Sequence, residues 1–500
     1  MIDVKKDISF DEKYIAAIDL GSSKIGLCVA LMQGQDLHIV YYKETPSAGI
    51  QSSTIFIPMQ TAGVIKKAIA EAEKELMIQI KQVVVGMPRN DVIQVTASAT
   101  MQREEPNEYI SWEEVQTIKA MALSTYPLPY PDKQAIYGAV AQSFTIEDGV
   151  QLVEKDVVGT LSPMLEGNFK VFVGRKKAHD SLDKIFNELG IEVLKRYFVP
   201  EVTAAAVLSK EELKNGVALV DIGAGVTSVS IYRGNIMRYY ASIPFGGASV
   251  SGDLETECSI DEDLAEKIKK RFGACIPEKL GEDKDKILQI RLTDPYIEIP
   301  VRYISEIVTA RYKELVEAIL FHIQESGMQN QLRGGIVLTG GASKQKNLDV
   351  LFKEESGYNV RRGYPKHKFS APAGASMYTP SATAAIGMVL AAREDDIPDC
   401  ASIPVKEEPK EEEMVTVIVT SQAPPQVDGQ LIDPDEFGKV EPKPGIQQTT
   451  VKVPKPTPGK GGDKGGDKEG DEGKEKTGVI ALVWETVENK LLKWYDEMNK

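Results

Sequence analysis

Short hydrophobic runs that end at a glycine turn alternate with stretches of helical periodicity from about Tyr14 to Ala392. Strand-like runs rich in β-branched residues are YIAAIDL (14–20), VALVDIG (217–223), SVSIYRG (228–234) and GGIVLTG (334–340). Apolar residues at helical spacing predict helices within 63–76, 178–190 and 308–327, and the last two close on glycine. This alternation of strands and helices predicts an α/β fold.

The pattern is lost at about Glu394, where the composition becomes rich in Lys, Glu, Pro and Gly. The stretch KPTPGKGGDKGGDKEGDEGKEKTG is almost pure low complexity. Such a segment cannot bury enough apolar surface to offset the entropy of its chain. We therefore interpret 394–477 as a disordered, charged linker.

A helical pattern returns in the last residues, 478–500. Its apolar stripe consists of Ile480, Val483, Trp484, Val487, Leu491, Trp494 and Met498. Two of the three tryptophans lie in it, and indole rings suit the headgroup boundary of a membrane. The polar face is not basic, so burial of apolar area must supply most of the binding. We predict an amphipathic membrane-targeting helix; the alternative is a helix that packs on a partner or on the body.

The composition of the chain argues against several classes of protein. The 500 residues are 42% hydrophobic and 27% charged, which suits a large core divided among domains. A formal net charge of −15 argues against nucleic acid as the main partner. The four cysteines form no CxxC pair, which argues against a disulfide framework or a zinc site. Neither a signal peptide nor a hydrophobic run of transmembrane length is visible, so we expect a cytoplasmic protein.

The first glycine turn, in AAIDLGSSKIG, follows a buried strand that ends near Asp19. The backbone N–H groups of Gly21, Ser22 and Ser23 can approach a phosphate, because glycine has no side chain to block it. Lys24 adds a positive charge, and Asp19 would face a metal held by that phosphate. Alone, this pattern is more often that of a simple β-hairpin.

The second turn, in VALVDIGAGVTSVSIYRG, repeats the design about two hundred residues later. A strand ends near Asp221, and the turn contains Gly223, Ala224 and Gly225, followed by Thr227. Two such copies predict two similar halves that point their turns at one ligand.

The third turn, in GGIVLTGGASKQKNLDVLF, places Gly340, Gly341 and Ala342 between an apolar strand and an amphipathic helix. A pair of glycines at this position lets a flat base and a ribose lie against the main chain. The pattern is neither the dinucleotide-binding fingerprint nor a P-loop.

In this order, the three turns resemble the phosphate 1, phosphate 2 and adenosine motifs of the actin/Hsp70/sugar kinase superfamily. The resemblance implies ATP as ligand, with Mg²⁺ held by Asp19 and Asp221 directly or through water. IPFGGASVSGDL (243–254) and LAEKIKKRFG (264–273) are similar to bacterial actin homologues. By that similarity, Gly246 and Gly247 line the nucleotide, and Glu266 and Lys269 approach the ribose and the adenine.

Two further stretches, AGIQSSTIFIPMQTAGVIKKAIAEAEKEL and QVVVGMPRNDVIQ, resemble the approach to the inserted subdomain of FtsA, the cell-division actin homologue. The disordered linker and C-terminal helix are likewise FtsA features. The resemblance implies an actin/Hsp70-like two-lobed ATPase fold with an inserted FtsA-type subdomain. The expected divisions are 14–82 and 167–214 for lobe 1 (1A), 83–166 for the insert (1C), 215–244 and 333–393 for lobe 2 (2A), 245–332 for subdomain 2B, 394–477 for the linker and 478–500 for the helix.

Two departures from the family pattern concern hydrolysis. The second turn reads DIGAGVTS where DIGGGT is usual, so Ala224 stands at a glycine position. PEVTAAAVL (200–208) is closer to the chaperone and MreB motif, which places Glu201 where those relatives position the attacking water. With Asp19 and Asp221 as the other catalytic residues, we expect ATP binding with at most slow hydrolysis.

The resemblance implies a polymerising cell division protein that tethers the FtsZ ring to the cytoplasmic face of the cell membrane. Its expected partners are the FtsZ C-terminal peptide, docking near Arg302 to Tyr312, further copies of itself, membrane lipids and other divisome proteins, but no nucleic acid. The alternatives are another bacterial actin such as MreB or PilM, an Hsp70-type chaperone, and a sugar or carboxylate kinase. The long tail favours the FtsA-like membrane tether over these alternatives.

Overall fold

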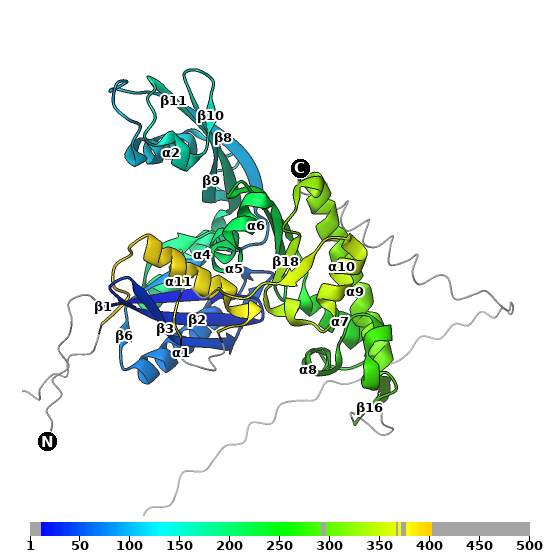
Figure 1. Ribbon diagram of the computed structural model, residues 1–500. Coiled ribbons are helices and arrows are strands. Elements are labelled where there is room, and N and C mark those ends of the chain that lie inside the picture. The colour runs from blue at the N-terminus through cyan, green and yellow to red at the C-terminus, as the bar shows by residue number, and fades with distance from the viewer. Residues whose placement is uncertain (1–11, 292–296, 367–368, 372–376, 403–500) are drawn as a thin grey trace, which may run out of the picture. The chain divides into compact units, whose positions relative to one another are not determined.

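The computed structural model describes residues 12–291, 297–366, 369–371 and 377–402. The chain divides into two compact units, 1–410 and 411–500, and every described residue belongs to the first. Most of the predicted linker and all of the predicted membrane helix, with Ile480, Val483, Trp484, Val487, Leu491, Trp494 and Met498, therefore lie outside the described residues. The described chain is a mixed α/β structure, as the sequence predicts (Figure 1).

The first sheet has the strand order β12-β7-β1-β2-β3. Strands β1, β2 and β3 are antiparallel to one another, and β7 and β12 extend the sheet parallel to β1. The bounds are Glu12–Leu20 for β1, Lys24–Gln33 for β2, Asp36–Pro46 for β3, Gln82–Gly86 for β7 and Glu192–Tyr197 for β12. Residues 15–18 of β1 are almost inaccessible to solvent, which is why this run is hydrophobic without alternation.

The second sheet repeats this topology in the order β15-β14-β13-β18-β19. Strands β13, β14 and β15 are antiparallel, and β18 and β19 continue parallel to β13. The bounds are Val217–Ile222 for β13, Thr227–Arg233 for β14, Ile236–Ile243 for β15, Ile336–Thr339 for β18 and Val360–Arg362 for β19. The prediction of two similar halves is therefore confirmed at the level of strand order and direction.

A third sheet, β10-β9-β11-β8, is inserted between β7 and β12. Its strands are β8 Ile93–Gln102, β9 Gln134–Ile146, β10 Gln151–Leu152 and β11 Met164–Arg175. Helix α2 (Trp112–Thr125) packs on it and begins at a capping box between Ser111 and Glu114. The sheet has a core of its own, which includes Phe144 and Phe169 in an edge-to-face contact. The residue divisions expected from the sequence stay predictions.

The remaining helices cover the sheets and form a helical part beside the second sheet (Figure 1). They are α1 Pro58–Leu76, α3 Glu154–Val157, α4 Lys176–Leu189, α5 Val199–Val207, α6 Lys210–Asn215, α7 Gly247–Cys258, α8 Glu262–Phe272, α9 Val301–Glu325, α10 Leu348–Ser356 and α11 Thr383–Glu394. Three two-stranded ladders complete the described fold: β4 Ile50–Gln51 with β5 Thr54–Ile55, β6 Gln79–Ile80 with β20 Ala401–Ser402, and β16 Ile287–Ile290 with β17 Ile297–Pro300.

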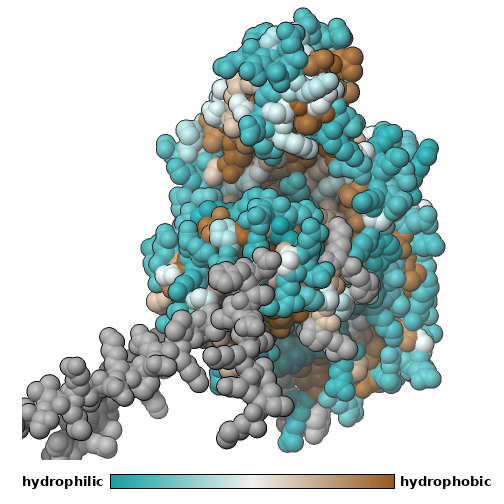
Figure 2. Space-filling model, turned by 60° about the vertical axis from the view of Figure 1, so that its left-hand side comes forward, coloured by the Kyte–Doolittle hydropathy of each residue, from teal (hydrophilic) through white to brown (hydrophobic). Residues whose placement is uncertain are grey.

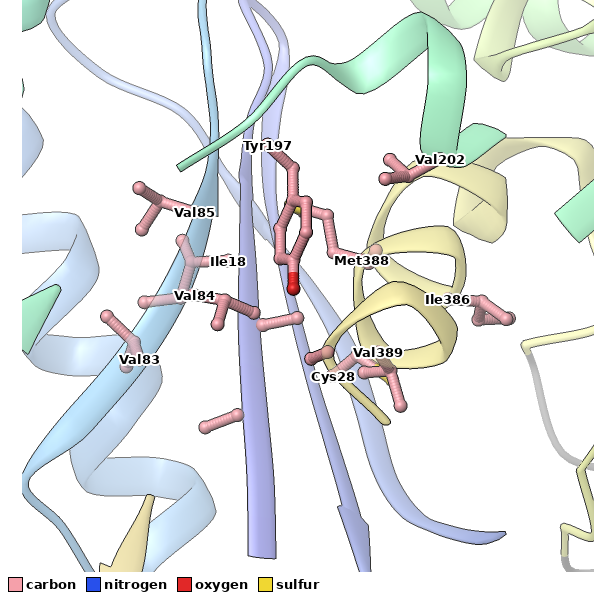
Figure 3. Packing of buried hydrophobic residues seen from close by; sticks show 14 of the residues in the cluster. Ile18, Cys28, Val83, Val84, Val85, Tyr197, Val202, Ile386, Met388 and Val389 are labelled. Atoms are coloured by element: carbon pink, nitrogen blue, oxygen red, sulfur yellow. The ribbon is translucent and has the colours of Figure 1, made fainter. Parts of the chain in front are cut away.

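The largest core lies between the first sheet and the helices α5 and α11 (Figure 3). Ile18 and Cys28 of the sheet belong to the same buried cluster as Met388 and Val389 of α11. At Gly86 the packing is so close that a Cβ would lie 2.5 Å from a methyl carbon of Val199. This core fixes the end of β7, and with it the residues that follow.

The described surface is mostly hydrophilic on the face shown in Figure 2, where hydrophobic residues form separate patches. Exposed large apolar side chains include Phe56, Ile57 and Met59, which lead into and begin α1. Among the described residues, no helix is long and apolar enough to cross a bilayer.

Candidate functional site

The first predicted turn joins β1 to β2 and is closed by one backbone hydrogen bond. The N–H of Gly21 donates to the carbonyl oxygen of Lys24 at 3.1 Å. A Cβ on Gly21 would lie 2.6 Å from that oxygen, so the turn requires glycine. The strand pairing sets Asp19 opposite Gly26, at the end of β1.

The second predicted turn, between β13 and β14, has the same geometry. The N–H of Gly223 donates to the carbonyl oxygen of Val226 at 2.9 Å, and a Cβ on Gly223 would lie 2.8 Å from it. Asp221 pairs with Ser228 at the end of β13, as Asp19 does with Gly26. The two strand ends are therefore equivalent in local structure as well as in sequence.

The two turns meet in space. A Cβ on Gly225 would lie 3.0 Å from the hydroxyl oxygen of Ser22 in the first turn. The same atom would lie 3.1 Å from the backbone of Ser52, in the turn between β4 and β5. That turn is tied to the first, because the Ser53 N–H donates to Ser22 Oγ at 2.9 Å. The backbone at all three places is thus within reach of one ligand.

The third predicted turn reaches the same point. Gly340 has a φ of +84°, and a Cβ there would lie 2.3 Å from a carboxylate oxygen of Asp221. A Cβ on Gly341 would lie 3.8 Å from the ammonium nitrogen of Lys24. The turn lies between β18 and α10, as expected, and residues Gly341–Lys344 of it form a 3₁₀ turn.

The structure adds a residue that the sequence analysis did not select. Arg89, three residues after β7, places its guanidinium between the two aspartates. Its Nη1 donates to Asp221, and its Nη2 lies 3.5 Å from Asp19 Oδ1. The exposed fractions of these side chains are 13% for Arg89, 7% for Asp221 and 17% for Asp19. Its sequence context, a charged residue three positions beyond a buried strand in VVVGMPRN, does not by itself indicate these partners.

Burial and neighbouring charges shift the pKa values of Asp19 and Arg89. Burial raises the pKa of Asp19 above its ordinary value, and the nearby negative charge of Asp221 acts in the same direction. The Arg89 guanidinium opposes this shift. Although burial lowers the pKa of Arg89, the two carboxylates outweigh it and raise that pKa. Arg89 is therefore a permanent cation at this point.

Lys24 is held at the edge of the site by an ion pair. Its ammonium nitrogen lies 2.5 Å from Glu44 Oε1, and Tyr42 donates to the same carboxylate at 2.8 Å. Burial lowers the pKa of Lys24, and the bond to Glu44 counteracts the shift. Lys24 faces the third turn, as its proximity to Gly341 shows.

The predicted base-contacting residues form a compact polar cluster between α7 and α8. Lys269 is buried and pairs with Glu266; its ammonium group donates to the Gly247 carbonyl at 2.6 Å and to Ser251 Oγ at 2.8 Å. Ser251 in turn donates to Glu266 at 2.5 Å. A Cβ on Gly247 would lie 2.9 Å from the Cβ of Ala342, which brings this cluster to the third turn.

Gly246 and Gly247 also connect to the second turn. The N–H groups of Gly247 and Ala248 donate to the carbonyls of Gly223 and Ala224 at 2.9 and 2.8 Å. A Cβ on Gly246 would lie 2.4 Å from the Gly223 carbonyl oxygen. The start of α7 is thus part of the same junction.

Two predicted residues have other surroundings. The hydroxyl of Thr227 is buried and donates to the Phe245 carbonyl at 2.9 Å, which is a structural bond. Glu201 lies exposed in the first turn of α5. Among the described residues, no hydrogen bond or ion pair joins Glu201 to either aspartate. Its role in hydrolysis stays a prediction.

The residues present fit a nucleotide better than they fit a magnesium ion between the carboxylates. Glycines at Gly21, Gly223 and Gly340 leave the backbone uncovered where phosphates and a base need it. The two carboxylates, however, already have a guanidinium between them. Within the described part of the chain, no three His, Cys, Asp or Glu side chains gather as a metal site.

Comparison with known proteins shows similarity to cell division proteins. The family model "Cell division protein FtsA" matches residues 218–387. The chain is 26% identical over 391 residues to the cell division protein FtsA of Neisseria meningitidis, covering 76% of this chain and 90% of that protein. It is 28% identical over 357 residues to the FtsA of Pseudomonas aeruginosa, covering 71% and 83%.

Among solved structures, the chain is similar to one from the PilM-PilN type IV pilus biogenesis complex. The TM-score is 0.54 at 16% identity, covering 76% of this chain and 98% of that one. At this level of identity the likeness shows the fold alone. The predicted actin-like fold class is thereby confirmed.

Proposed function

We propose that this chain, a homologue of the FtsA cell division proteins, is an actin-like cell division protein that binds ATP, polymerises and tethers the FtsZ ring to the cytoplasmic membrane. The observation that carries the proposal is that the three turns meet. Gly225 of the second turn lies against Ser22 of the first, and Gly340 of the third turn lies against Asp221. Together with the relationship to FtsA, this junction supports a nucleotide-dependent role in division.

In this proposal, the backbone N–H groups of 21–23 and 223–225 receive the phosphates. The main chain at 340–342 lies against the base and ribose, and Lys269 and Glu266 contact them from α8. Bound ATP contributes favourable contacts to both lobes at once, so it stabilises their association. The hydrogen bonds from Gly21 and Gly223 already hold two of the turns in shape. Binding therefore costs little conformational entropy in these loops.

Hydrolysis is at most slow in this account. Neither aspartate is free to hold a metal unless Arg89 moves, and Glu201 lies exposed on α5. Slow turnover suits a protein whose nucleotide state controls assembly rather than metabolism.

The partner contacts of the proposal rest on the FtsA relationship. The FtsZ C-terminal peptide would dock on α9, from Arg302 onward. There the Arg302 side chain is exposed and pairs with Glu306 at 3.1 Å, whereas Tyr312 is buried. The exposed start of this helix therefore offers the contact, and Tyr312 supports it from the core. Other divisome proteins and further copies of the chain complete the expected assembly.

Membrane attachment is assigned to residues 478–500. A single helix without a basic face binds weakly, and a filament that carries many such helices binds far more firmly through effective concentration. The proposal therefore places the protein on the cytoplasmic face of the cell membrane at the division site.

Liposome co-sedimentation tests the whole proposal. The full chain and a variant that lacks 478–500 are compared, each with and without ATP and with and without purified FtsZ. We expect the full chain to sediment with liposomes and to carry FtsZ with it, more so with ATP, and the truncated chain to stay soluble. Equal sedimentation of both chains, or failure to recruit FtsZ, would contradict the proposal. An assembly role like that of a pilus protein has only the shared fold in its favour.

A further inference from the structure

We propose that Arg89 is a built-in counter-cation that takes the place of a divalent metal between Asp19 and Asp221, so that the nucleotide binds without magnesium. This inference rests on the proposed ATP site. Neither the sequence pattern nor the FtsA relationship assigns a role to Arg89.

The backbone of Arg89 is fixed from two sides. Its N–H donates to Ser53 Oγ at 3.2 Å, and its carbonyl accepts a hydrogen bond from the Tyr240 hydroxyl at 2.8 Å. Ser53 belongs to the β4–β5 turn, which is bonded to Ser22. Tyr240 belongs to β15 of the second sheet, and its ring packs edge-on against Phe198 at 5.0 Å between centroids. Both halves of the fold therefore hold the residue in place.

The side chain is held as firmly as the backbone. The guanidinium spans from Asp221 on β13 to Asp19 on β1, which belong to different sheets. All three side chains are largely buried, where an unpaired charge is costly. A planar guanidinium presents donors in a fixed fork that suits carboxylates and phosphates alike. Arg89 therefore cross-links the two aspartates and faces the turns that would receive the phosphates.

A magnesium ion would compete poorly for this position. It needs nearly octahedral oxygen coordination and gives up its water reluctantly. To reach both carboxylates it must displace a buried cation and leave Arg89 without its partners, which is strongly unfavourable. Two carboxylates are enough for a magnesium ion that also binds phosphates, but here the Arg89 guanidinium is already paired with both of them. The resident arginine is the better-fitting cation.

The consequence is a separation of nucleotide binding from metal binding. Arg89 offsets the negative charge of the aspartates and leaves the triphosphate to the backbone N–H groups and Lys24. It does not supply bound water molecules, as a magnesium ion does, so a nucleophile is not oriented at this point. Retention of the triphosphate with slow hydrolysis follows directly.

The test is a titration of a fluorescent ATP analogue into the full-length protein, in magnesium chloride and in EDTA. For the natural protein we expect the dissociation constant to change by less than about threefold between the two conditions. For Arg89→Ala we expect weak binding in EDTA and recovery of at least about tenfold in magnesium, because the ion now enters between the carboxylates. Arg89→Lys keeps a cation and should remain nearly independent of magnesium.

Arg175→Ala is the matched control, because Arg175 is 63% exposed and pairs with Asp91 outside the three turns. Thermal melting without nucleotide gives a second readout: magnesium should stabilise Arg89→Ala and leave the natural protein unchanged. A natural protein that loses binding in EDTA as strongly as Arg89→Ala does would overturn the inference. Absence of binding in both conditions would overturn the ATP site itself.

Discussion

Gly225 lies against Ser22, so close that a side-chain carbon at residue 225 would stand 3.0 Å from the serine hydroxyl oxygen. The two residues are far apart in sequence and belong to the turns of different sheets. Ser22 also accepts a hydrogen bond from the Ser53 N–H, so one hydroxyl organises three segments. Contacts of this kind turn two separate hairpins into one site.

Ser22→Ala should therefore loosen the site without unfolding the protein. The substitution leaves the Ser53 N–H without its acceptor, which costs about 1–3 kcal/mol for a buried donor. Urea unfolding should show this loss, and hydrogen exchange should be faster at the Ser53 amide. Ser124→Ala, which removes an exposed helical hydroxyl, is the control and should change little. Unaltered exchange at Ser53 would show that Ser22 does not hold the turn.

Lys269→Met should weaken ATP binding by about tenfold, because the ammonium group supports Gly247, Ser251 and Glu266 together. Selectivity for ATP over GTP, measured by competition with a fluorescent analogue, should fall as well. Lys270→Met is a matched control: Lys270 lies 3.0 Å from the same Glu266, but its side chain is 68% exposed. Similar losses for both variants would remove Lys269 from the proposed base contact.

His322→Gln should reduce the acid sensitivity of folding. Burial lowers the pKa of His322 below its ordinary 6.5, and the Tyr239 hydroxyl lies 3.0 Å from its Nδ1. A histidine with a lowered folded pKa contributes stability above its unfolded pKa, and that contribution is lost as the pH falls through the folded pKa.

The melting temperature of the natural protein should thus drop on acidification from about pH 7.5 to about pH 5, and His322→Gln should show a smaller drop. His179→Gln, a histidine beside Asp180 and Asp183, is the control. An equal drop for the natural protein and His322→Gln would assign the acid sensitivity to other groups.

Trp484→Glu should release the full-length protein from liposomes. Placing a charge in the apolar stripe opposes burial at the headgroup boundary, which is the main source of affinity for a helix without a basic face. Trp112→Glu is a suitable control, because Trp112 is an exposed tryptophan at the start of α2. Continued sedimentation of Trp484→Glu would refute the membrane assignment.

The three turns were accessible from the sequence because each combines an apolar strand with glycines that the backbone geometry requires. Gly21, Gly223 and Gly340 carry that signal locally. Their meeting was inferred from the repeat and from the family resemblance. The third turn was predicted between a strand and a helix, and the structure has it there; its 3₁₀ form, Gly341–Lys344, was not predicted, since such short elements leave little periodicity to detect.

Arg89 was missed because its significance is entirely non-local. Its partners, Asp19 and Asp221, come from strands of two sheets, and only the fold brings them to it. At Thr227 the structure adds a bond that the motif does not indicate, because the hydroxyl donates to the Phe245 carbonyl. The contact of Thr227 with a nucleotide stays a prediction. A motif gives the residue's place in the chain and not the direction of its hydrogen bond.

The central claim is that one nucleotide binds where the three turns meet, and Gly340 tests it most directly. Gly340→Ala would set a Cβ 2.3 Å from an Asp221 oxygen at a φ of +84°. Gly252→Ala is the control, because that helical glycine has open space around it. Titration with a fluorescent ATP analogue should show affinity for Gly340→Ala reduced at least about a hundredfold and for Gly252→Ala within about twofold. A folded Gly340→Ala protein, verified by its circular dichroism and melting, that bound ATP like the natural chain would contradict the account.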